Sequence, residues 1–71
     1  MSKLNFTTSI TSELLAADVA KVIKHLEDEE TPHEVRVRKI RHLIREITIY
    51  CHDHHSDYFE SIFRTLELPL I

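Results

Sequence analysis

The chain contains no glycine, and this absence constrains its fold more than any other single feature. The phosphate-binding loops of P-loop and dinucleotide-binding folds need glycine, because only a residue without a side chain lets the backbone approach the phosphates closely. Nucleotide-dependent enzymes built on those folds are therefore excluded. Tight two-residue hairpins also favour Asn-Gly or Asp-Gly, whereas helical spacing of apolar residues dominates this sequence. We therefore expect an all-α protein.

The length of 71 residues fits a single small helical domain over residues 1–71. A chain of this size buries only roughly 60% of the surface that it exposes when unfolded. Its single cysteine cannot form an internal disulfide, so a partner subunit is the remaining common source of stability. We expect a homo-oligomer, with a dimer favoured.

The first helix is predicted over residues 10–29, after an N-terminal arm over residues 1–9 in which a brief strand is an alternative. Apolar residues step by three and four along the helical segment, as they do on one face of a helix: Leu15, Val19, Val22, Ile23 and Leu26.

The second helix is predicted over residues 32–53. Thr31, Pro32 and Glu34 read as an N-cap, a first helical residue and the glutamate that closes a capping box. The core stripe of this helix would be Val37, Ile40, Leu43, Ile44, Ile47 and Cys51. A connection of only a few residues predicts that the first two helices form an antiparallel hairpin.

A third helix is predicted over residues 57–67, followed by an apolar tail over residues 68–71. The residues between Cys51 and Asp57 are poor helix formers, so we expect a break there. The alternative is one continuous helix from Pro32 to about Glu67. The expected fold is thus a small bundle of two to three helices, completed by homo-oligomerisation.

The side of the second predicted helix opposite its core stripe mixes basic and apolar residues, which suggests a surface that binds a macromolecule. We predict a small non-enzymatic regulatory or inhibitory adaptor that binds another protein through Val35, Arg38, Arg41, His42, Arg45 and Ile49. The alternative is a nucleic-acid-binding regulator that uses Arg38, Arg41 and Arg45. The formal net charge of −3 weighs against that alternative.

The chain carries more apolar residues than one small helical subunit would cover, and monomers rarely leave such patches open. We predict that the oligomer interface is built from Leu4, Phe6, Tyr58, Phe59, Ile62, Phe63, Leu66, Leu68 and Leu70.

A second alternative function is a zinc-binding module at the Cys/His cluster, with Cys51, His54 and His55 as weak candidate ligands. Structural zinc sites show two paired spacings, and this chain has only one cluster. We therefore expect no metal and no cofactor, and a cluster that is structural and sensitive to pH.

Catalysis has little support, because the sequence lacks a nucleophile held by a rigid turn beside a base. We expect no enzyme activity.

No stretch approaches the ~20 apolar residues of a membrane span, and the start of the chain lacks the apolar region of a secretion signal. A cytoplasmic protein is predicted.

Overall fold

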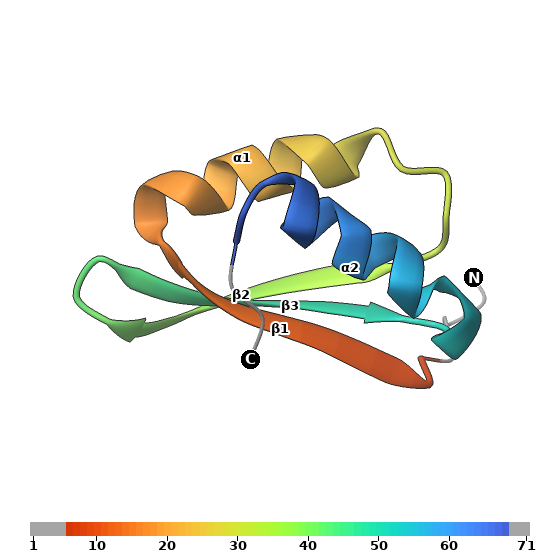
Figure 1. The fold of residues 1–71 in the computed structure, drawn as a ribbon. Coiled ribbons are helices and arrows are strands. Elements are labelled where there is room, and N and C mark those ends of the chain that lie inside the picture. Colours follow the sequence, from red (N-terminus) through yellow and green to blue (C-terminus); the bar gives the residue numbers. More distant parts are fainter. Residues whose placement is uncertain (1–5, 69–71) are drawn as a thin grey trace.

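Three strands and two helices follow one another in the order β1, α1, β2, β3, α2 (Figure 1). The structure, a computed structural model, describes residues 6–68. The elements are β1 (Thr8–Leu15), α1 (Ala16–Glu27), β2 (Glu34–Arg41), β3 (Ile44–Cys51), the short 3-10 helix η1 (Asp53–His55) and α2 (Ser56–Thr65). The prediction of an all-α helical bundle is therefore wrong: this is an α+β fold.

The strands form one antiparallel sheet in the order β1-β3-β2. Because β1 and β2 both run antiparallel to β3, they are parallel to each other, and α1 connects them across the sheet. Both helices lie on the same face of the sheet (Figure 1). The other face is not covered by either helix.

The predicted helix over residues 10–29 is correct only from Ala16 onward. The preceding residues form β1, where Ile10, Ser12 and Leu14 are buried and the residues between them are not. This alternation has the period of two that a half-buried strand requires. The strand begins at Thr8, inside the segment predicted as the arm.

The predicted helix over residues 32–53 is wrong, and with it the antiparallel helix pair. This segment is the β2–β3 hairpin. Thr31 does not open a helix; instead, its carbonyl oxygen lies 2.7 Å from Nδ1 of His33 in the loop before β2. The segment is rich in valine and isoleucine, which favour strands because their branched side chains pack well on a pleated surface.

A helix is present where the third helix was predicted, since α2 covers most of the range 57–67. The predicted break in a preceding helix does not apply, because a strand, β3, precedes η1. The alternative of one continuous helix from Pro32 is wrong for the same reason.

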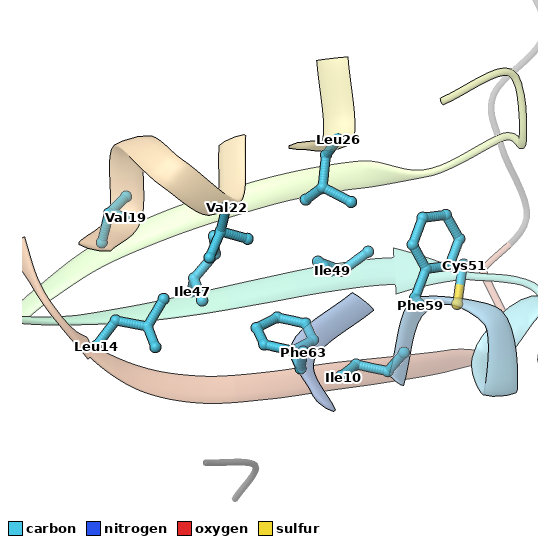
Figure 2. Close-up of a cluster of buried hydrophobic side chains, with 10 residues drawn as sticks. All are labelled: Ile10, Leu14, Val19, Val22, Leu26, Ile47, Ile49, Cys51, Phe59 and Phe63. Carbon is cyan, nitrogen blue, oxygen red and sulfur yellow. The ribbon is translucent and has the colours of Figure 1, made fainter. Parts of the chain in front are cut away.

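The hydrophobic core lies between the sheet and the two helices (Figure 2). Ten residues are buried in it: Ile10, Leu14, Val19, Val22, Leu26, Ile47, Ile49, Cys51, Phe59 and Phe63. They come from β1, α1, β3 and α2, so β2 supplies none of them.

Candidate protein-binding surface around β2

Strand β2 is the most exposed element of the sheet. Four successive residues, 36–39, are exposed, and only Glu34, Val35 and Ile40 are partly covered. Within residues 6–68, β2 pairs with β3 on one side and with no strand on the other. It therefore presents an unpaired row of backbone N–H and C=O groups, which is the usual template for an added strand.

The register with β3 fixes the face on which each β2 side chain lies. Val35 and Val37 stand opposite the buried Ile49 and Ile47, so they lie on the helix-bearing face. The helices approach β1 and β3 more closely than β2. Val37 is consequently 43% exposed, although it lies on the face that holds the core.

The arginines of β2 lie on the open face, where they pair with glutamates. Arg38 contacts Glu46 at 3.0 Å and Arg41 contacts Glu13 at 2.9 Å. Both arginine side chains are about two-thirds exposed or more, so each ion pair contributes at most about 1 kcal/mol to stability.

Arg36 combines an ion pair with an aromatic contact. Its Nε lies 3.4 Å from Oε1 of Glu34, and its guanidinium carbon lies 5.5 Å from the ring centre of Tyr50. The ring of Phe6 packs against the same tyrosine, at 5.6 Å between ring centres. A hollow of about 300 Å³ on this side is lined by Arg36, Val37, Arg38, Glu46, Thr48 and Tyr50.

The charge of β2 is opposite in sign to that of the chain. The strand carries three arginines and one lysine against one glutamate, a net charge of +3, whereas the whole chain carries −3. Lys39 forms no ion pair with any residue between 6 and 68, and it stands opposite Arg45 in the register. The β2 edge is thus a local basic surface on an acidic chain.

The residues predicted to bind a partner are partly brought together here. Val35, Arg38 and Arg41 lie on β2, and His42 lies in the turn that follows. Ile49 is fully buried on β3, and Arg45 lies on the face opposite Arg38. The surface that unites the first four is a strand and its turn, not the face of a helix.

Arg36, Val37 and Tyr50 complete this surface but were not among the predicted binding residues. The signal for Arg36 and Val37 was present in the sequence. Apolar and basic residues alternate strictly from Val35 to Arg38, which is the period of a strand with two different faces.

The residues predicted for an oligomer interface are mostly used within the chain itself. Phe59 and Phe63 are fully buried in the core, and Ile62, Leu66 and Leu68 pack against it. Tyr58 stays 46% exposed. Phe6 packs on Tyr50, while Leu4 and Leu70 lie outside the described residues.

The three candidate metal ligands lie in different environments. Cys51 is fully buried beside Phe59 in the core (Figure 2). Burial raises the pKa of its thiol, and the negative charge of Asp53 raises it further. Within residues 6–68, no group of three or more histidine, cysteine or acidic side chains is arranged to hold a metal ion.

The histidines after β3 form a compact cluster of rings. The ring centres of His54 and His55 are 3.9 Å apart, and His52 stacks on His54 at 5.7 Å. Partial burial lowers the pKa of His55, and the neighbouring charges of His54 and His52 lower it further.

Neither α1 nor α2 is long and apolar enough to cross a membrane. Comparisons of the chain with protein-family models, with curated proteins and with solved structures found no match. The geometry of the chain is therefore the basis for inferring its function.

Proposed function

We propose that this chain is a small non-enzymatic regulatory or inhibitory adaptor that binds an extended segment of another protein along β2. The observation that carries the proposal is that β2 supplies no residue to the buried core and has no neighbouring strand on its outer side within residues 6–68. An extended peptide that joins such an edge gains main-chain hydrogen bonds, and the side chains on either side give specificity.

The side chains of β2 suit this mode of binding. On the helix-bearing face, Val35 and Val37 offer apolar contact at the rim of the core. On the opposite, open face, Arg36 and Arg38 supply hydrogen-bond donors. The edge therefore offers apolar contacts to one side of a bound strand and polar contacts to its other side. The single cysteine, a buried thiol, fits a reducing compartment, and we place the adaptor in the cytoplasm.

Site-specific photo-crosslinking tests the proposal. A photoreactive amino acid replaces Val37, and in a matched control it replaces Ala20, which is exposed on α1. In a lysate of cells that naturally contain this protein, we expect the label at position 37 to capture a discrete protein that the label at position 20 does not capture. Capture at position 20 alone would contradict binding through β2.

A homodimer remains part of the proposal. Among residues 6–68, the large apolar side chains that stay exposed besides Val37 are Leu15, Leu43 and Tyr58, each about half exposed. Light scattering at micromolar concentration measures the mass directly. A mass of 8.4 kDa that does not change with concentration would contradict the dimer.

Nucleic-acid binding is the second candidate, and the contact of Arg36 with Tyr50 favours it, because single strands bind to aromatic rings bordered by basic residues. Glu46 on β3 and Glu13 on β1 share that face with the arginines and oppose a phosphate backbone lying across it, whereas a strand added outside β2 meets the arginines first. A gel shift with random duplex and with RNA at two salt concentrations tests this candidate. Absence of a shift at low salt would exclude it, because phosphate contacts are strongest there.

A further inference from the structure

We propose that the segment bound along β2 is acidic and has a strand pattern, with glutamate or aspartate alternating with apolar residues. This inference rests on the proposed function and adds the chemistry of the partner. It follows from the two different faces of β2 and from the sign of its charge.

A strand added to the outer edge of β2 places its side chains alternately on the two faces of the sheet. Residues opposite Val35 and Val37 lie on the helix-bearing face, where Val37 is 43% exposed and an apolar neighbour would cover it. Residues opposite Arg36 and Arg38 lie on the open face. The edge therefore selects apolar and polar residues in alternation.

The polar positions favour acidic residues. The side chains of Arg36 and Arg38 are 68% and 71% exposed even though each touches a glutamate. A guanidinium has five N–H donors, and these contacts use only one or two of them. On the other, helix-bearing face, Lys39 stands opposite Arg45 and adds positive charge next to Val37. Basic residues opposite these positions are repelled, whereas carboxylates accept the unused hydrogen bonds.

The same charges disfavour a second copy of the chain as the occupant. In a two-fold pairing of β2 with itself, the axis passes beside one residue, which then faces its own counterpart. An axis at Arg36 or at Arg38 places two identical arginines opposite each other. An axis at Val37 places each Arg36 opposite an Arg38. Every pairing centred on the middle of β2 thus brings like charges together.

Fluorescence anisotropy with three labelled peptides tests the proposal. The peptides alternate valine with glutamate, with glutamine or with lysine, and are otherwise identical. We expect the glutamate peptide to bind the full chain at least about tenfold more tightly than the glutamine peptide, and the lysine peptide not to bind. The preference for glutamate should shrink between about 50 mM and 300 mM salt, because exposed charges are screened.

Two variants locate the binding. The double variant Arg36→Gln/Arg38→Gln should lose the preference for glutamate over glutamine, while the control Lys21→Gln/Lys24→Gln on α1 should keep it. Circular dichroism confirms that each variant is folded. If the double variant does not fold, Arg36→Gln alone serves, with an expected partial loss of the preference.

The outcomes separate this inference from the proposed function. Equal binding of the glutamate and glutamine peptides overturns the acidic preference and leaves strand addition intact. A preference for glutamate that survives in the Arg36→Gln/Arg38→Gln variant places the peptide elsewhere and overturns the inference. Crosslinking at position 37 to a second copy of the chain would name a different occupant and overturn the inference. Binding of a single-stranded oligonucleotide by a chain that binds none of the three peptides would do the same.

Discussion

The backbone N–H of Ala16 donates a hydrogen bond to the carbonyl oxygen of Leu43, with 2.9 Å between nitrogen and oxygen. Ala16 is the first residue of α1, and the preceding Leu15 provides no side-chain cap. The first N–H groups of a helix have no partner within it. The β2–β3 turn therefore satisfies one of these groups and ties the hairpin to the start of α1.

Leu43→Gly should stabilise the protein. Leu43 has a φ of 64°, in the left-handed region that costs a residue with a side chain about 1 kcal/mol or more. Its side chain is 59% exposed, so little packing is lost when it is removed. We expect the free energy of unfolding to rise by about 0.5–1 kcal/mol in urea denaturation.

Leu43→Ala is the matched control, because it removes most of the side chain and keeps the left-handed cost. Its stability should stay close to that of the natural chain. An equal gain in both variants would mean that the exposed leucine side chain, not the backbone, is the source of the effect.

This turn also explains why the fold class was mispredicted. The absence of glycine was taken to disfavour hairpins, but Leu43 adopts the left-handed conformation itself. Glycine is only the least costly residue at such a position, and the pairing of β2 with β3 outweighs a cost of about 1 kcal/mol. Composition alone does not report that balance.

The spacing of apolar residues misled over residues 10–15 and 32–51, which form strands, and succeeded over α1 and α2. Ile40, Ile44, Ile47 and Cys51 recur at helical intervals, but Ile47, Ile49 and Cys51 also alternate by two, and the structure follows the second pattern. Such a segment fits both periods, and its β-branched residues decide in favour of a strand. α1 and α2 were predictable because their apolar residues fit the helical period alone.

The proposed binding surface on β2 was predictable only in part. Val35, Arg38 and Arg41 were selected from their residue types and lie on β2. To predict how these residues are arranged, one must know that β3 lies on one side of β2 and that the helices lie over the other strands. Those are long-range contacts, which no local pattern contains.

Phe63→Ala should be severely destabilising. Phe63 is fully buried between α2 and the sheet, and removing its ring leaves a cavity in a small core. Such substitutions cost about 3–5 kcal/mol, a large part of the stability of a domain of this size. Thermal unfolding measures the effect, with Val37→Ala on the exposed strand as the control. A similar small loss in both variants would contradict the core described here.

Tyr58→Phe should weaken the contact between the two helices. The hydroxyl of Tyr58 on α2 donates a hydrogen bond to the carboxylate of Glu29, just after α1. This bond, followed by partial burial and the negative charge of Glu29, raises the pKa of Tyr58. The variant should melt at a slightly lower temperature at neutral pH, whereas Tyr50→Phe should not. Identical melting of both variants would show that the bond contributes nothing.

Chelation should leave the protein unchanged. The thiol of Cys51 lies in the core, and the ring cluster of His52, His54 and His55 lies outside it on η1 and the residue before it. We expect no stoichiometric zinc in protein purified without an affinity tag, and no loss of ellipticity when EDTA is added. Zinc at one equivalent, removed by EDTA with loss of structure, would contradict this expectation.

Acidification should destabilise the protein through His55. Its pKa is lowered in the folded chain, so the unfolded chain, with the ordinary value of about 6.5, binds the proton more tightly. The stability that neutral His55 contributes is therefore fully present above the unfolded-state pKa. It is lost as the pH falls from there through the lower folded-state pKa. The melting temperature should drop between about pH 7.5 and 5.5, and His55→Asn should reduce the drop.

The control is His25→Asn, on α1, which should leave this drop in melting temperature unchanged. Parallel curves for the natural chain and His55→Asn would show that this imidazole does not carry the acid sensitivity.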